Sequence, residues 1–295
     1  MSSARPAVAI ARPLPSRRSA TALKKGLSLL NHAILIGLSV LMVGPFLWMI
    51  SASLKTEVAI SRYPPEILSQ PVMASNYLQA IQTFPFGIFA FNSVKIATLA
   101  TIGTVLSTTL AAFAYARMDF PGKKLLFSIQ LATLMIPGVV HIIPAFMIMK
   151  SLGWINTHYP LIVPHFLGGA FGTFLLRQFF LTIPREYDDA AKIDGAGYLI
   201  ILSRIYAPLA KPALATLAVF TFMASWNDFL GPIIYLTSEK LMTLQVGLQY
   251  FRGQYQIQTN LLMAGAVITV APIVIIYVVA QKYFVQGVTM SGLKG

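Results

Sequence analysis

The chain of 295 residues contains no cysteine and few charged side chains. The absence of cysteine excludes disulfide bonds and thiolate metal sites. Charged residues make up 11% of the sequence, whereas a soluble domain usually carries about 25%. Hydrophobic residues make up 56%. Such a chain could not cover its surface with polar groups in water, so the composition excludes an ordinary soluble globular protein.

Acidic residues are the scarcer charged type, with nine Asp and Glu against 22 Lys and Arg and a formal net charge of +13. In a soluble protein this excess would suggest a nucleic-acid partner. The basic N-terminal segment has no aromatic residues among its charges, so we expect no nucleic-acid partner. In a membrane protein the same excess is typical of cytoplasmic loops, and membrane lipid is then the expected surroundings.

Long uncharged runs are the most prominent feature that the sequence does have. A bilayer core of about 30 Å requires roughly 20 apolar helical residues. Six runs meet this requirement, at about 27–54, 89–116, 125–149, 159–176, 212–236 and 261–280. They predict an all-α polytopic membrane protein with six transmembrane helices in a transmembrane domain at 27–284.

The distribution of Lys and Arg predicts how the chain is oriented. Most of them lie in an N-terminal tail at 1–26, in the loop after the second run, in a large loop at 184–211 and in a C-terminal tail at 285–295. We therefore expect these segments, including both termini, to be cytoplasmic. No small-residue cleavage site clearly ends the first apolar run, so we expect a tail and an uncleaved span rather than a signal peptide.

Four of the nine acidic residues fall in the large loop: Glu186, Asp188, Asp189 and Asp194. Pro184 suits a first helical position, and the acids complement the positive end of the helix dipole. Asp188 and Lys192 are four residues apart and are expected to pair on one helical face. Asp194 and Gly195 form a stop signal, and a second short helix is predicted from about 198 to 206. The loop is thus predicted to be a helix-turn-helix outside the membrane.

Small side chains accompany these acids. Ala190, Ala191 and Gly195 keep one surface flat enough for close approach by a partner. A solvated acidic loop would explain the charges, but not the small residues or the stop signal. A metal site or a general acid-base site is disfavoured because no histidine lies nearby.

The loop also carries a motif. It reads Asp189-Ala190-Ala191, three residues, Gly195, nine residues, Ile205, one residue and Ala207-Pro208. This pattern resembles the loop motif of binding-protein-dependent ABC import permeases, which reads Glu-Ala-Ala, x3, Gly, x9, Ile-x-Leu-Pro. Asp189 stands in place of the usual Glu and Ala207 in place of the usual Leu, while the spacing is intact.

Further segments narrow the resemblance. They are Gly44-Pro45-Phe46-Leu47-Trp48, Ser53-Leu54-Lys55, Phe91-Asn92-Ser93, Ser225-Trp226-Asn227-Asp228-Phe229 and the end of the chain from Gly287 to Gly295. Together they are similar to the smaller, six-span permease subunit of carbohydrate importers related to the maltose system. The resemblance implies a type I ABC importer permease fold in the bacterial cytoplasmic (inner) membrane.

The same resemblance implies partners and site residues. The partners are a second permease subunit that forms a heterodimer with this one, two ATPase subunits that hold ATP and Mg, and an extracytoplasmic solute-binding protein that delivers a carbohydrate. The family handles neutral oligosaccharides, phosphorylated polyols and acidic uronate oligosaccharides, so an acidic substrate such as a uronate oligosaccharide stays open. The residues that resemble the ATPase-coupling helix are Glu186, Asp188, Asp189, Ala190, Ala191, Asp194 and Gly195.

The loop at about 249–259 is the candidate contact for the binding protein or the substrate. Its candidate residues are Tyr250, Phe251, Arg252, Gln254, Tyr255 and Gln256. Aromatic rings can stack on sugar rings, and amides can pair with their hydroxyl groups. An aromatic belt at the membrane interface would explain the same residues equally well.

Three polar residues lie in or beside the apolar runs. Asp228 falls near the outer end of the fifth run, where we favour a helix cap over a gate or substrate contact. For His141 and His165 we favour packed or hydrogen-bonded side chains over substrate contacts.

The sequence predicts a subunit without catalytic residues, metal or cofactor of its own. It has no GxxxxGK[ST] phosphate loop, so ATP hydrolysis is assigned to the partner ATPases. An ion-coupled secondary transporter is the alternative, but it would call for charges deep in several spans and an inverted repeat. A polytopic membrane enzyme would require clustered histidines or acids at one membrane face. Neither pattern is evident.

Overall fold

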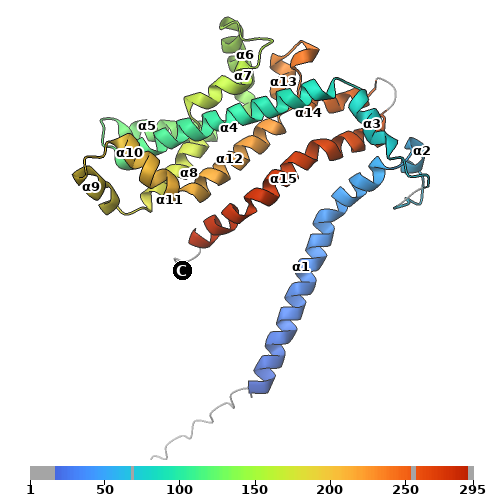
Figure 1. Cartoon of the computed structure of the whole chain (residues 1–295), viewed down its shortest axis with the longest axis horizontal. Helices are drawn as coiled ribbons and strands as arrows, with labels where there is room; N and C mark the ends of the chain where they lie inside the picture. Colours follow the sequence, from blue (N-terminus) through green and yellow to red (C-terminus); the bar gives the residue numbers. More distant parts are fainter. Residues whose placement is uncertain (1–16, 68–69, 254–256, 292–295) are drawn as a thin grey trace, which may run out of the picture.

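The structure is a computed structural model that describes residues 17–67, 70–253 and 257–291, with side chains described over 25–67, 70–253 and 257–281. Its described part is almost entirely helical, as predicted, and contains one isolated β-bridge, between Arg252 and Ile257 (Figure 1). The first half comprises α1 (Arg17–Ser53), α2 (Glu57–Ile60), α3 (Ser75–Gln82), α4 (Phe86–Arg117), α5 (Lys123–Ala132), η1 (Thr133–Met135), η2 (Gly138–His141) and α6 (Ile142–Ser151). The second half comprises α7 (Tyr159–Ile162), η3 (Val163–Leu167), α8 (Ala170–Leu181), α9 (Glu186–Ile193), α10 (Tyr198–Ile201), η4 (Leu202–Tyr206), α11 (Ala207–Leu209), α12 (Lys211–Trp226), α13 (Leu230–Tyr235), η5 (Glu239–Leu241), α14 (Leu244–Gly247), η6 (Leu248–Phe251) and α15 (Thr259–Ser291).

Four helices in the described part are long and apolar enough to cross a membrane, and there are six candidates if each of two bent helix pairs is counted as one span. The four are Lys25–Ser53, Phe86–Arg117, Tyr159–Leu181 and Thr259–Gln281. The two bent pairs are Lys123–Met135 with Gly138–Ser151, and Tyr198–Leu209 with Lys211–Trp226. This arrangement supports the predicted polytopic all-α fold.

Helix α4 is the centre of the body. It packs against α8, α12 and η3, and α12 in turn packs against α15 (Figure 1). Two groups of buried side chains hold this arrangement together. One, around Phe180 and Tyr206, joins α4 and α8 to the loop before α12. The other, around Phe89, Trp226 and Phe251, joins the opposite end of α4 to α12, α15 and the loop before α15.

Helix α1 differs from the rest because most of it points away from the body (Figure 1). It packs against α15, but its apolar side chains are largely uncovered, with Leu41 and Met42 exposing 73% and 74% of their surface. Such a surface suits lipid or another apolar helix rather than water. The helix begins at Arg17, well inside the predicted tail at 1–26, since the residues that follow Pro15 are good helix formers.

Both ends of α15 differ from the predicted span at 261–280. The helix begins at Thr259 and continues to Ser291. The first part of the predicted C-terminal tail at 285–295 is therefore helical, and residues 292–295 lie outside the described part of the chain.

Three predicted runs are interrupted helices. The run at 125–149 bends by 102° between η1 and η2, where Pro137 lacks an N–H and holds Ile136 in an extended conformation. The run at 159–176 breaks at Gly168, whose φ is +91°, before α8 begins. The run at 212–236 breaks between Trp226 and Leu230. Hydropathy located these runs but not their breaks.

Candidate functional site

The acidic loop forms helix α9, as the start and stop signals predict. Three acids occupy its first turn, and Asp194 ends it. Gly195 then takes a φ of +78°, a left-handed conformation that glycine adopts without steric cost. The N–H of Gly195 donates to the carbonyl of Lys192 at 3.0 Å, and the N–H of Ala196 donates to that of Ala191 at 2.9 Å. Pro184 lies before the helix rather than at its first position, since Arg185 is the N-cap.

One face of α9 is open to solvent. Glu186, Asp189, Ala190 and Asp194 are exposed, and Ala191 is half-buried. Ile193 exposes 86% of its surface, which is unusual for a large apolar side chain on a polar helix. An exposed face that combines acids, small residues and one isoleucine is suited to contact with another protein.

Asp188 faces the opposite way, and its predicted pairing with Lys192 is wrong. Its side chain is buried, and its Oδ2 lies 3.7 Å from Nε of Arg117 at the end of α4. The two side chains are only 9% and 4% exposed. Asp188 therefore fastens α9 to α4 and is not available for contact with a partner.

Arg117 is held by more than this ion pair. One of its terminal nitrogens donates to the carbonyl of Phe180 at 2.6 Å and also to that of Ile183. Its guanidinium lies 5.0 Å from the ring centre of Tyr206. A single buried cation thus joins the end of α4 to the end of α8, to α9 and to η4. The role of Arg117 is not predicted by the sequence, since its partners are distant in sequence.

The second predicted helix of the loop is present as α10, η4 and α11. The middle element, η4, is a π-helix. Ile201, Leu202 and Tyr206 from this segment are buried against Phe113 of α4 and Phe180 of α8. The Tyr206 ring lies 5.1 Å from the Phe113 ring and 5.4 Å from the Phe180 ring, both edge-on. The acidic loop is consequently packed as part of the body.

The candidate contact residues of the 249–259 loop differ in their burial. Phe251 is fully buried and packs edge-on against Phe84 at 5.9 Å, so its predicted role as a contact residue is wrong. Tyr250 is 43% exposed, and its hydroxyl donates to Oε1 of Glu239 at 2.8 Å. Burial, and then this hydrogen bond, raise the pKa of Tyr250. Arg252 is exposed.

The other three outer-loop candidates, Gln254, Tyr255 and Gln256, lie outside the described residues. Of the six candidates, Tyr250 and Arg252 are therefore the two that the structure places at an accessible position. Their contact with a partner stays a prediction.

Two buried polar residues of α4 fix the segment from η5 to the start of α14. Nδ2 of Asn92 donates to the carbonyls of Lys240 and Met242, at 2.9 and 3.0 Å. The hydroxyl of Ser93 accepts from the N–H of Leu244 at 2.9 Å. Both residues belong to the Phe91-Asn92-Ser93 segment, and these hydrogen bonds are their physical role in the structure.

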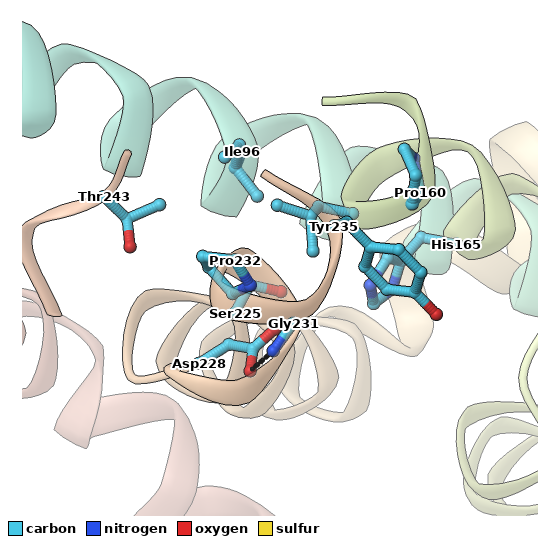
Figure 2. Close-up of a pocket in the computed structure, with 10 residues that line it drawn as sticks. Ile96, Pro160, His165, Ser225, Asp228, Gly231, Pro232, Tyr235 and Thr243 are labelled. Atoms are coloured by element: carbon cyan, nitrogen blue, oxygen red, sulfur yellow. Dashed lines mark hydrogen bonds between the residues drawn. The ribbon is translucent and has the colours of Figure 1, made fainter. Parts of the chain in front are cut away.

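A cavity of about 150 Å³ lies between α4, the α7–η3 segment and the break between α12 and α13 (Figure 2). Its polar lining residues are His165, Ser225, Asp228, Tyr235 and Thr243. Oδ1 of Asp228 accepts from the N–H of Gly231 in the first turn of α13 at 3.0 Å, which resembles the predicted cap, although Phe229 holds the N-cap position. Asp228 also lines the cavity.

The two histidines near the apolar runs differ in their surroundings. Nδ1 of His165 lies 2.9 Å from the hydroxyl of Thr104 on α4, so this side chain is hydrogen-bonded as predicted. His141 is exposed where η2 meets α6, so it is not packed within the described part of the chain, and its predicted role stays a prediction. In the part of the chain that was described, no group of three or more His, Asp or Glu residues could hold a metal ion.

Comparison with known proteins agrees with this architecture. The family described as "Binding-protein-dependent transport system inner membrane component" matches residues 28–290. The sulfoquinovosyl glycerol transport system permease protein SmoH of Agrobacterium fabrum is 33% identical over 264 residues, which cover 88% of this chain and 93% of that protein. The trehalose/maltose transport system permease protein MalG of Thermococcus litoralis is 32% identical over 280 residues, 92% of this chain and 98% of that protein.

One solved structure is similar to this chain over nearly its whole length. A chain of a bacterial ABC transporter involved in the import of the acidic polysaccharide alginate aligns with a TM-score of 0.77 at 24% identity, covering 92% of this chain and 100% of that chain. At this identity the likeness shows the fold. Together with the family match over nearly the whole length, it establishes that this chain belongs to the family of binding-protein-dependent transport system inner membrane components.

Proposed function

We propose that the chain is the membrane-spanning permease subunit of an ABC importer that passes a carbohydrate from an extracytoplasmic binding protein into the cytoplasm. ATP hydrolysis on separate subunits drives the transport. The observation that carries this proposal is helix α9, whose acidic, small-residue face is exposed while Asp188 fastens its other face to α4. A non-catalytic subunit driven from outside requires such an external, rigidly attached surface.

The proposed partners are a second permease subunit, two ATPase subunits and the binding protein. The family description names dependence on a binding protein. A further solved structure of similar fold is that of a bacterial alginate ABC transporter in complex with alginate pentasaccharide-bound periplasmic protein. These findings favour the ABC importer over an ion-coupled secondary transporter. The uncovered apolar surface of α1 is suited to contact with a second permease subunit.

The proposed orientation places α9 in the cytoplasm and the loops around Asn92 and Tyr250 outside, with both termini cytoplasmic. The bias of Lys and Arg toward the 184–211 loop supports it. The α9 loop and the outer loops then lie at opposite ends of α4 (Figure 1). A displacement of α9 would reach the outer end through one continuous helix of 32 residues.

The proposed mechanism of coupling is a rigid-body shift. An ATPase that docks on the face around Asp189 would move α9 when it closes. Since Arg117 joins α9 to both α4 and α8, these helices would move with it. Hinge-and-shear changes of packed helices are common in proteins that alternate between two states. Glu186, Asp189 and Ala190 would form the docking face, with Asp194 and Gly195 ending it, while Ala191 packs against the Phe180 and Tyr206 cluster.

Uptake of labelled sugar by cells that carry the complete importer tests this function. The charge reversal Asp189→Lys should abolish uptake while the protein stays in the membrane at its normal level. Asp119→Lys is the matched control, because Asp119 is an exposed acid outside α9 whose side chain is 86% exposed. If Asp189→Lys and Asp119→Lys both transport normally, the docking role of α9 is refuted.

A further inference from the structure

The cavity beside Asp228 lies at two interruptions of the helical backbone. The polypeptide between α12 and α13 borders it on one side, and the α7–η3 segment borders it on another (Figure 2). Within the depth of a membrane, non-helical backbone is tolerated where protein buries it or where it lines a water-filled cavity. In secondary transporters, discontinuous helices form the sites for the substrate and its coupling ions. The cavity shares with such sites the interrupted backbone that borders it.

Some polar atoms of the residues that line the cavity make no hydrogen bond to the described residues. The hydroxyl of Thr243 is buried without a hydrogen-bond partner in the described part of the chain, and the residue is only 4% exposed. Asp228 uses Oδ1 for the N–H of Gly231, and His165 uses Nδ1 for Thr104. Asp228 and His165 therefore each keep a second polar atom for another partner. The buried hydroxyl of Thr243 is energetically costly unless a ligand or water forms a hydrogen bond with it.

The remaining walls are apolar. Ile96, Pro160 and Pro232 face the same space as the polar groups, and the ring of Tyr235 lies beside that of His165 (Figure 2). Apolar faces together with hydroxyl-binding groups match a sugar ring, which has C–H faces and a rim of hydroxyl groups. The volume of about 150 Å³ is below the roughly 300–1,000 Å³ of a complete small-molecule site. The cavity can hold part of a solute, and so it is one subsite.

The charge of the lining selects among sugars. None of the ten lining residues is Lys or Arg, and Asp228 is the acid among them. A carboxylate accepts hydrogen bonds from sugar hydroxyls. The same group repels the carboxylate of a uronate, most strongly where little water screens the two charges.

We propose that Asp228 and Thr243 bind a neutral, hydroxyl-bearing sugar residue in this cavity during its passage, so that this subunit contributes its own carbohydrate subsite. The inference rests on the proposed function. Asp228 accepts from a sugar hydroxyl through Oδ2, and Thr243 pairs with another hydroxyl. The subsite favours neutral oligosaccharides over acidic ones.

The test uses cells that carry the complete importer and its binding protein, with sugar uptake and ATP hydrolysis both measured. Probes are a set of labelled neutral disaccharides and a labelled uronate disaccharide. Thr243→Val removes the hydroxyl at nearly constant shape, and Asp228→Asn removes the charge while keeping an oxygen for Gly231. Thr109→Val is the control, because Thr109 also has a buried, unpartnered hydroxyl among the described residues but does not line the cavity.

The expected result is that a neutral sugar is carried and that Thr243→Val and Asp228→Asn each lower the sugar taken up per ATP by about tenfold, the effect of losing one good hydrogen bond. Thr109→Val should stay within about twofold. If the wild type carries sugar but both variants match Thr109→Val, or if it prefers the uronate, the subsite is refuted. If the wild type carries no sugar with ATP and binding protein present, the proposed function itself fails. Should Asp228→Asn not reach the membrane, Thr243→Val decides the outcome.

Discussion

Replacing Asp188 by leucine is expected to lower the free energy of unfolding by about 3 kcal/mol. Removing one partner of a buried ion pair usually costs about 3–5 kcal/mol, because the other charge is left uncompensated. The side chains of Arg117 and Asp188 are 4% and 9% exposed, so water cannot replace the lost carboxylate. We expect the lower end of the range because Arg117 keeps the carbonyls of Phe180 and Ile183 as acceptors.

Two matched variants separate the ion pair from other effects. Asp119→Leu breaks the pair between Lys123 and Asp119, whose side chains are 22% and 86% exposed, and should cost less than about 1 kcal/mol. The double replacement Arg117→Leu with Asp188→Leu leaves no unpaired charge but also removes the donor to the carbonyls of Phe180 and Ile183, so its cost should be well below the sum of the two single costs.

The free energy of unfolding would be measured on the purified protein in detergent, with protease cleavage in the 184–211 loop as a local readout. Asp188→Leu should make this loop much easier to cleave, since α9 loses its attachment to α4. If Asp188→Leu costs no more than Asp119→Leu and the loop stays protected, Arg117 does not fasten the loop.

Three further changes test other contacts. Gly195→Ala places a side chain at a φ of +78° and should destabilise the end of α9 by about 1–2 kcal/mol, and Gly195→Asn should cost less. Hydrogen exchange at α9 measures both variants, and exchange equal to that of the wild type in both would contradict this prediction. Phe251→Ala should lower the free energy of unfolding by about 3–5 kcal/mol, whereas Tyr250→Phe should lower it by only about 0.5–1.5 kcal/mol. Thermal unfolding compares the two variants, and a larger loss for Tyr250→Phe would show that Phe251 is not a core residue. Asn92→Leu removes two hydrogen bonds to the outer loop and should speed hydrogen exchange over 239–247, while unchanged exchange would show that Asn92 does not hold that loop.

Local signals in the sequence predicted much of the fold. Hydropathy located the apolar runs, because each helix must be uncharged over its own length to cross a bilayer. The acids, the alanines and Gly195 predicted where α9 begins and ends, since capping depends on residues within a few positions of one another. The hydrogen bond between Asp228 and the N–H of Gly231 is also local, because the two residues are three positions apart.

Predictions failed where the partner is distant in sequence. Spacing paired Asp188 with Lys192, but the buried guanidinium of Arg117 lies closer once α4 and α9 meet. Composition grouped Phe251 with accessible aromatic residues, but the ring fills a gap beside Phe84 and is fully buried. In both cases burial decided the role of the side chain, and burial depends on how the helices pack.

The sequence by itself determined that the chain is a helical membrane protein with an acidic helix-turn-helix outside the apolar runs. These properties follow from hydrophobicity and capping, which act over a few residues. Only the tertiary structure decided that Arg117 joins this loop to two long helices and that Thr243 and Asp228 line one cavity. The physical reason is that buried ion pairs and cavities form between side chains that packing alone brings together.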